Sequence, residues 1–318
     1  MAESAMYFAD EGALRRYKAK RLISRIFLYF FITFFALFML FPFVFMLIGS
    51  LTDAESFATF TSTADFKYIG FDKWNFSNFE QIFSSQIVNK ITGQTVSRPS
   101  FAQYYLNTLI SAVGSTTVTV VTAVLAAFAF ARLEFKGKNL LFTFLLATMM
   151  IPGELMVLTN YKTTKALDWE YTFSALIFVH GVSVFYIFYL RQTFQQIPNE
   201  LYLAAKVDGV GDVGYLVKVM IPIAMPTIVT IIILSLMGAW NSYVWPLLVA
   251  NGGWKYDKSY SMQLVSNGLM SLFTSDIADG YDAIKIAGSM VVTFPLFVFF
   301  LIFRKYIMRG VSRSGIKG

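Results

Sequence analysis

Residues that could bind a sugar gather near the end of one apolar stretch. Trp240, Asn241, Tyr243 and Trp245 follow a run of uncharged residues. Flat aromatic rings can stack on the C–H faces of a sugar, and an asparagine amide can both donate and accept hydrogen bonds. These residues are therefore candidates for a substrate pathway. Tryptophan and tyrosine are also common where a membrane helix meets the bilayer surface, and that explanation stays open.

Two ionisable residues stand inside other apolar stretches. Glu154 follows Pro152 and Gly153, and an ionisable group within a membrane must face protein or water. Glu154 is therefore a candidate for lining the pathway or contacting an external partner, unless its helix ends nearer the membrane surface. His180 has small and apolar neighbours and no chain of carboxylates. That setting is more typical of a hydrogen-bonded structural histidine than of a proton relay.

A polar segment, residues 197–226, separates two apolar stretches. Pro198 should end the preceding helix, and Asn199 is a plausible N-cap followed by an acid, Glu200, where the helix dipole favours one. A short helix with a small-residue face should follow. The residues that share this face by their spacing are Leu201, Ala204, Ala205 and Asp208.

The end of this short helix also has a signature. Gly209 suits a C-terminal cap, and Asp212 could begin a second short helix that stops near Pro222. The pattern predicts a helix-turn-helix on the membrane surface. An amphipathic helix that lies on lipid without a protein partner would give the same pattern, and this second interpretation stays open.

Composition excludes several classes of protein. Hydrophobic residues make up 56% of the 318 residues and charged residues 14%, against about 25% in soluble domains. The chain has no cysteine, which excludes disulfides and cysteine-ligated metals, and its single histidine argues against a histidine metal site. It has no Ser-His-Asp set, no paired carboxylates and no GxxxxGK phosphate loop. We therefore expect a non-catalytic membrane subunit without a cofactor, and any ATP and Mg²⁺ must bind another subunit.

The apolar stretches predict an all-α integral membrane fold with six transmembrane helices. They divide the chain into an N-terminal segment (1–25), a transmembrane domain (26–308) with polar loops at 52–103, 196–222 and 251–285, and a C-terminal tail (309–318). The six expected helices cover residues 26–51, 105–131, 139–160, 171–190, 223–250 and 286–303.

The positions of the basic residues predict the orientation of these helices. The chain has 26 Lys and Arg against 19 Asp and Glu, and most of the basic residues lie in the short segments 1–25, 132–138, 191–222 and 304–318. Basic residues accumulate in cytoplasmic segments of membrane proteins, so we expect both termini inside. The 196–222 loop is then cytoplasmic, and the loops 52–103 and 251–285 are external. This distribution argues against nucleic acid as the partner.

The 196–222 loop resembles the EAA loop of ABC-importer permeases at Ala204, Ala205, Asp208, Gly209 and the Ile221-Pro222 pair. In that family this loop docks into a cleft of an ATPase subunit, so the resemblance implies an ATPase-coupling role for these residues. Leu203 stands where the motif has glutamate and Val210 where it has alanine. Glu200 matches the acidic residue that often precedes the motif.

Other stretches resemble the carbohydrate-uptake branch, in the form of the second permease of maltose-type systems. The matching stretches, in chain order, are AFARLEFKGKNLLF, MIPGE, YLRQTFQQIPNEL, WNSYVWPL and KYIMRGVSRSGIKG. The resemblance covers about residues 22–318. It implies a heterodimer with a second permease, two cytoplasmic ATPase subunits that bind ATP and Mg²⁺, and an extracytoplasmic solute-binding protein, all at a bacterial inner membrane.

The same resemblance implies that the end of the chain, with Gly315, Lys317 and Gly318, reaches the ATPase dimer interface. A disordered basic tail on anionic lipid is the alternative. We expect an ATP-driven importer that takes up a carbohydrate, in particular an oligosaccharide. Glycerol-phosphate, polyol or acidic-polysaccharide uptake stays open. So do an ATP-independent carrier or channel, for which Glu154 is the main support, and a non-transporting scaffold or receptor.

Overall fold

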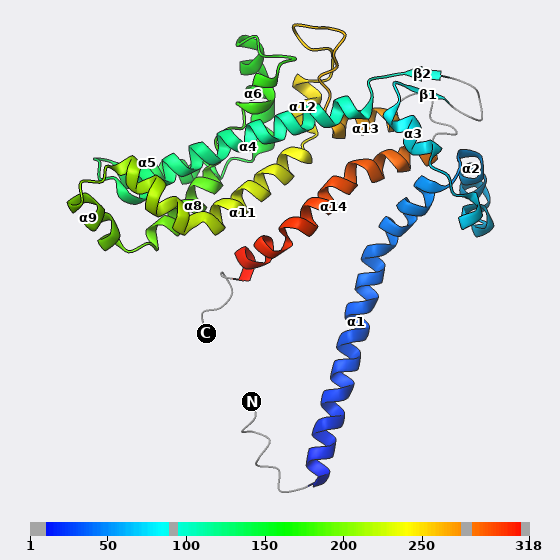
Figure 1. Cartoon of the computed structure of the whole chain (residues 1–318), viewed down its shortest axis with the longest axis horizontal. Coiled ribbons are helices and arrows are strands. Elements are labelled where there is room, and N and C mark those ends of the chain that lie inside the picture. The colour runs from blue at the N-terminus through cyan, green and yellow to red at the C-terminus, as the bar shows by residue number, and fades with distance from the viewer. Residues whose placement is uncertain (1–10, 89–94, 275–281, 313–318) are drawn as a thin grey trace.

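A computed structural model describes residues 11–88, 95–274 and 282–312 (Figure 1). This part of the chain is mainly helical. This is consistent with the expected all-α fold class; the described residues also hold one short antiparallel ribbon, in which β1 (Gln86–Val88) pairs with β2 (Thr95–Ser97). The ribbon lies in the 52–103 segment, away from the long helices.

Four helices in the described residues are long and apolar enough to cross a membrane. A fifth candidate is the pair α5 (Lys138–Thr148) and α6 (Gly153–Ala166), which are bent by 97° relative to each other. The four long helices are α1 (Glu11–Leu51), α4 (Phe101–Arg132), the continuous helix Asp212–Trp240 and α14 (Asp282–Ser312).

The helix expected over 139–160 is interrupted, because the chain turns at 149–152. The last amides of α5 bond three residues back, Met149 N–H to Leu146 O at 3.0 Å and Met150 N–H to Ala147 O at 3.1 Å. Pro152 then takes an extended ψ of 130°. Proline disfavours helical geometry in the residue before it, so the helix ends there and α6 starts in a new direction.

Two other expected helices are also interrupted. In place of one helix over 171–190, the structure has α7 (Phe173–Ile177) and α8 (Val184–Gln195), with non-helical backbone at 178–183. In place of one helix over 223–250, it has α11 (Ile221–Trp240) and α12 (Val244–Val249), with a break at 241–243. Both breaks matter for the candidate site.

The helix α4 is the centre of the bundle and packs against α8 and α11 (Figure 1). Small residues allow close approach, as at Gly114, where an added Cβ would lie 2.7 Å from Ile177. The main buried cluster joins these three helices and the 196–222 loop. Its members include Ala127, Phe128, Leu190, Phe194, Tyr215, Met220, Ala224 and Ile231.

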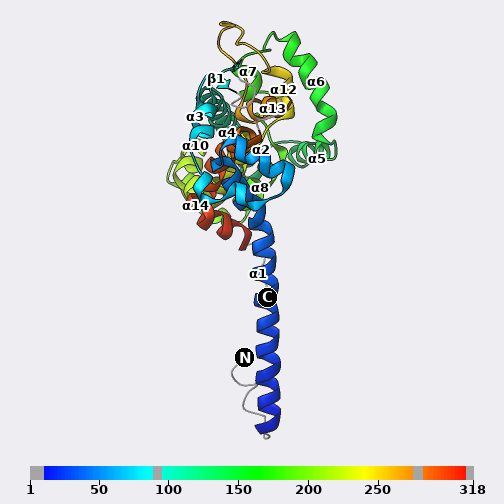
Figure 2. The ribbon, with the colours of Figure 1, turned by 90° about the vertical axis from the view of Figure 1, so that its right-hand side faces the viewer.

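The helix α1 stands apart from the rest of the molecule. Figure 2 shows it extending away from the bundle, and it packs mainly against α14. Its side chains between Leu22 and Leu47 are largely exposed hydrophobic groups. A helix that is apolar all round suits lipid or another membrane helix, so α1 must be covered in the membrane.

The described parts of the 52–103 segment, residues 52–88 and 95–103, contain short helices, as expected. These are α2 (Ala54–Thr63), η2 (Phe66–Ile69), η3 (Phe71–Lys73) and α3 (Ser77–Phe83). The buried amide of Asn78 ties the segment to the end of α1, because Nδ2 donates to Ser50 O at 3.0 Å and to Thr52 O at 2.7 Å. The 251–285 segment holds a helix too, α13 (Val265–Thr274), and α14 begins at Asp282, before the expected position 286.

Candidate functional site

The 196–222 loop folds into two short helices, α9 (Asn199–Val207) and α10 (Asp212–Tyr215). Gly209 has φ of +76° and ends α9. Its N–H donates to Lys206 O at 3.1 Å, and the Val210 N–H donates to Ala205 O at 2.8 Å. These two bonds define a Schellman cap, which confirms the predicted C-terminal cap. The N-cap prediction was off by one residue, because Pro198 holds that position and Asn199 is already helical.

The predicted stop at Pro222 is wrong. The helix that begins at Asp212 continues through Pro222 to Trp240. One π-helical turn, η4 (Leu216–Met220), precedes the proline, and the Ile221 N–H donates to Leu216 O, five residues back. Pro222 follows as one of the first residues of α11, and the altered hydrogen-bond pattern of the π-helical turn before it accommodates a residue without an N–H. The loop is therefore joined rigidly to a membrane-spanning helix.

The inner side of α9 is fastened to α10 and the core. The Tyr202 hydroxyl donates to Asp212 Oδ1 at 2.7 Å, Lys206 Nζ lies 2.7 Å from the same oxygen, and the Tyr202 and Tyr215 rings are 5.0 Å apart. The hydrogen bond to Asp212 raises the pKa of Lys206, so this pair is charged at neutral pH. Ala205 also packs against the core. The predicted small-residue face is thus divided, since Ala204 is exposed and Ala205 is half-buried.

The outer side of the loop is an exposed apolar surface with acids at its margins. Leu203 is 56% exposed, Val207 88% and Val213 72%. Glu200 and Asp208 are exposed beside them. Apolar side chains this open are costly in water, so the surface is typical of one that meets another surface. We call Leu203, Val207 and Val213 the outer apolar patch.

Arg132, at the end of α4, fixes the position of the loop. Its Nη2 donates to the carbonyls of Phe194, at 2.8 Å, and Ile197, and its Nη1 lies 3.5 Å from Asn199 Oδ1. The last carbonyls of α8 thus gain a cationic partner. Arg191 of α8 reciprocates, with Nε donating to Phe130 O at 3.1 Å. Sequence reasoning counted Arg132 only as a cytoplasmic charge, although an arginine directly at a helix end was the available signal.

We predict that Asp212→Ala loosens the turn between α9 and α10, because both Tyr202 and Lys206 lose their partner. Asp212→Asn keeps an oxygen for Tyr202, and should differ little from the native chain, since exposed ion pairs contribute little. Amide hydrogen exchange over 199–212 is the measurement. Exchange should be faster in the alanine variant alone. Because the hydrogen bond to Asp212 raises the pKa of Lys206, the stabilisation of the turn by charged Lys206 is complete at neutral pH. It is lost as the pH rises through that raised pKa.

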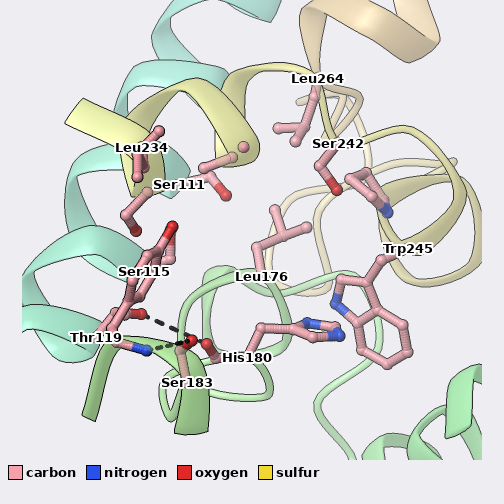
Figure 3. A pocket seen from close by; sticks show the side chains of 15 residues that line it. Ser111, Ser115, Thr119, Leu176, His180, Ser183, Leu234, Ser242, Trp245 and Leu264 are labelled. Carbon is pink, nitrogen blue, oxygen red and sulfur yellow. Dashed lines mark hydrogen bonds between the residues drawn. The ribbon is translucent and has the colours of Figure 1, made fainter. Parts of the chain in front are cut away.

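A second feature is a cavity of about 270 Å³ between α4, the 178–183 break and the 241–243 break (Figure 3). Seven of its fifteen lining residues carry hydroxyl groups, among apolar neighbours. Those groups belong to Ser111, Ser115, Thr119, Ser183, Tyr186, Ser235 and Ser242, and His180 and Trp245 complete its polar side chains. Sequence reasoning missed this cavity as a site.

The structure does not bring the predicted pathway residues together in this cavity. Trp240 packs on Tyr105, with ring centres 5.6 Å apart, and donates from Nε1 to Val292 O at 3.3 Å. Asn241 caps its own helix, because Nδ2 donates to Met237 O at 2.9 Å. The carbonyl of Tyr243 accepts from Asn267 Nδ2 at 3.3 Å. Glu154 is exposed in the first turn of α6, just after the bend.

His180 lies in the 178–183 break, not in the middle of a helix. Its ring stands edge-on to Trp245 with centres 5.0 Å apart. The imidazole makes no hydrogen bond to any residue that the structure describes, which differs from the hydrogen-bonded role expected of it. Within the same residues no group of three potential metal ligands exists. Gly315, Lys317 and Gly318 lie outside the described residues.

Long apolar helices, broken helices beside a polar cavity, and a rigid polar loop define this chain as a multi-pass membrane protein of the transporter type. The family of binding-protein-dependent transport system inner membrane components matches residues 119–313, and the chain belongs to this family. The matched region includes the cavity's α8 and α11 and the whole 196–222 loop. The predicted resemblance and the inner-membrane location are thereby confirmed.

Individual relatives match along nearly the whole chain. The arabinooligosaccharides transport system permease protein AraQ of Bacillus subtilis is 28% identical over 298 residues, which are 93% of this chain and 97% of AraQ. The trehalose/maltose transport system permease protein MalG of Thermococcus litoralis is 27% identical over 285 residues, 89% of this chain and 93% of MalG.

A solved structure shows the same fold. A bacterial ABC transporter involved in the import of the acidic polysaccharide alginate has a chain that superposes with a TM-score of 0.72. The match covers 90% of this chain and 97% of that chain, at 18% identity. At this level of identity the likeness bears on the fold alone.

Proposed function

We propose that this chain is a permease subunit of an ABC importer that takes up a carbohydrate, in particular an oligosaccharide, at a bacterial inner membrane. The observation that carries the proposal is the 196–222 loop, a capped helix with an exposed apolar surface, rigidly joined to α4, α8 and α11, in a chain of this family. The saccharides in the names of AraQ and MalG support the carbohydrate class.

In the proposed topology six segments cross the membrane with both termini inside. The four long helices supply four of them, the bent α5–α6 pair a fifth and the interrupted α7–α8 region a sixth. The excess of basic residues in the short segments supports this orientation. The 196–222 loop then faces the cytoplasm, and the 52–103 and 251–285 segments face outward.

In the proposed mechanism, two cytoplasmic ATPase subunits bind ATP and Mg²⁺ and close, and α9 transmits the motion. The Schellman cap at Gly209 and the continuous helix through Pro222 make the loop move with the membrane helices as one body. Leu203, in the place of the motif glutamate, would contribute an apolar contact to the ATPase cleft. Glu200, Ala204 and Asp208 would surround it, and Ala205 would hold α9 to the bundle.

The remaining proposed partners are a second permease, which would cover part of α1, an extracytoplasmic solute-binding protein and membrane lipid. Dependence on a binding protein is in the description of the family. We also propose that Gly315, Lys317 and Gly318 contact the ATPase pair. Glu154, Trp240, Asn241 and Tyr243 remain proposed pathway residues near the external side, supported by their position at chain breaks.

Co-purification tests this function. The chain carries a C-terminal tag on a long spacer, is extracted in mild detergent, and the proteins bound to it are identified by mass spectrometry. An ATPase subunit and a second permease in matching amounts, with ATP hydrolysis stimulated by a saccharide-loaded binding protein, are the expected result. A folded protein that purifies alone would contradict the proposal and favour an ATP-independent carrier or a scaffold.

A further inference from the structure

The non-helical backbone beside the cavity is stabilised by α4, because its carbonyl groups accept hydrogen bonds from threonine side chains of that helix. Thr122 Oγ1 donates to Gly181 O at 2.8 Å, and Thr119 Oγ1 lies 3.5 Å from His180 O. Gly181 lets the chain approach closely, since an added Cβ would lie 2.5 Å from Val118. Non-helical backbone at membrane depth is tolerated where protein buries it or where it lines a cavity. Interrupted helices of this kind mark binding sites in transporters.

Several polar groups of the lining are available to a ligand. Ser115 and Ser183 make local hydrogen bonds, Thr119 contacts the His180 carbonyl, and Ser235 accepts from Thr116 at 3.1 Å. Four polar side chains of the lining make no hydrogen bond to any residue that the structure describes. They belong to Ser111, Tyr186, Ser242 and His180, which line the cavity from different elements; Figure 3 labels Ser111, Ser242 and His180.

The chemistry of the lining selects a neutral, hydroxyl-rich ligand. A hydroxyl group both donates and accepts hydrogen bonds, so it can pair with a sugar hydroxyl as the donor or as the acceptor. No lining side chain in the described residues is an Asp, Glu, Lys or Arg. An acidic sugar would therefore lose its hydration without gaining a cation, which is costly. Trp245, whose Nε1 donates to Ala175 O at 3.0 Å, adds a fixed aromatic ring to the wall.

The size of the cavity is sufficient for a sugar ring. Its volume of about 270 Å³ is many times the roughly 10–15 Å³ that one water molecule needs on the same measure. The site therefore has room for at least one ring of a saccharide.

We propose that this cavity, between α4 and the two chain breaks, binds one neutral sugar ring of the transported saccharide within this subunit. The inference rests on the proposed import of a carbohydrate and adds to it a contact site and a substrate class. The site excludes uronic acids, so the chain would import neutral saccharides.

Equilibrium binding to the assembled permease–ATPase complex, without the binding protein, tests the proposal. The probes are labelled maltose and arabinobiose as neutral saccharides and digalacturonate as an acidic one. Ser111→Ala and Ser242→Ala should each weaken binding of the neutral probe about threefold to tenfold, as expected for one lost hydrogen bond. Ser242→Thr keeps a hydroxyl and should bind nearly as the native chain. Ser115→Leu should remove binding by filling the space.

Thr117→Val is the matched control, because Thr117 is exposed on another side of α4 and bonds only to Val113 O. It should leave binding unchanged. Co-purification of the partner subunits with each variant shows that it is folded. Native affinity in both alanine variants, equal binding of digalacturonate, or no neutral binding by the native complex would each overturn the proposal. Saccharide uptake by the complete transporter would still stand in those cases, so failure of this site and failure of the proposed function are distinguishable.

Discussion

Substituting Gly209 with proline will lower saccharide-stimulated ATP hydrolysis by about tenfold or more, while the chain still inserts and binds the second permease. Gly209 has φ of +76°, and proline is fixed near −65°. The change also removes the N–H that donates to Lys206 O. The Schellman cap cannot form, so α9 must change direction. We expect coupled hydrolysis and uptake to fall about tenfold or more. A loss of roughly 1.4 kcal/mol in the free energy of docking lowers the docked population tenfold.

Gly209→Asn is the matched control. Asparagine accepts left-handed backbone better than other residues with side chains. Nothing lies within 4 Å of an added Cβ at this position, so the substitution introduces no clash. The asparagine variant should keep most of its activity. Native activity in the proline variant would show that the geometry of this turn does not matter for coupling.

Removing the guanidinium of Arg132 should have the second largest effect. Arg132→Ala leaves the Ile197 carbonyl without this partner, at a cost of about 1–3 kcal/mol if it stays buried and unpaired, while the Phe194 carbonyl keeps the Ile197 N–H as a donor at 3.3 Å. The loop then loses its link to the end of α4. We expect uptake to fall about tenfold, together with faster amide exchange over α9.

Two variants separate the role of Arg132 from its charge. Arg132→Lys keeps the charge but lacks the planar guanidinium that donates to two carbonyls at once. Its activity should therefore lie between that of Arg132→Ala and the native chain. Lys136→Ala removes a charge from the same short turn, where the side chain is exposed, and should leave uptake near the native level. Equal losses in Lys136→Ala and Arg132→Ala would mean that only the net charge of the turn is important.

The local features of the 196–222 loop were accessible from sequence. Pro198, Gly209 and Asp212 act through backbone rules that hold within a few residues, and each lies at or next to a predicted helix end. Pro222 misled the prediction, because a π-helical turn supplies space that a regular helix lacks. That turn depends on how Tyr215 and Met220 pack in the core, and no local rule contains this information.

The cavity could not be predicted, because it depends on contacts between distant segments. The 178–183 break is stabilised by Thr119 and Thr122 from α4, about 60 positions earlier in the chain. Hydropathy alone favoured continuous helices there, since both apolar stretches are long enough to span. The position of Arg132 at a helix end was a visible signal, but its acceptors could not be identified from it, since they lie in α8 (residue 194) and just after α8 (residue 197).

The account is tested most directly by a cross-link from the outer apolar patch. The chain has no cysteine, so Val207→Cys creates a unique attachment point at a side chain that is 88% exposed. A cysteine-linked photo-crosslinker at 207 should join this chain to a subunit that contains a GxxxxGK phosphate loop, and ATP should change the yield. The same label at Phe144, which is exposed on α5, is the control. It should not cross-link to that subunit. A label at 207 that reacts only with lipid would contradict the coupling role of α9.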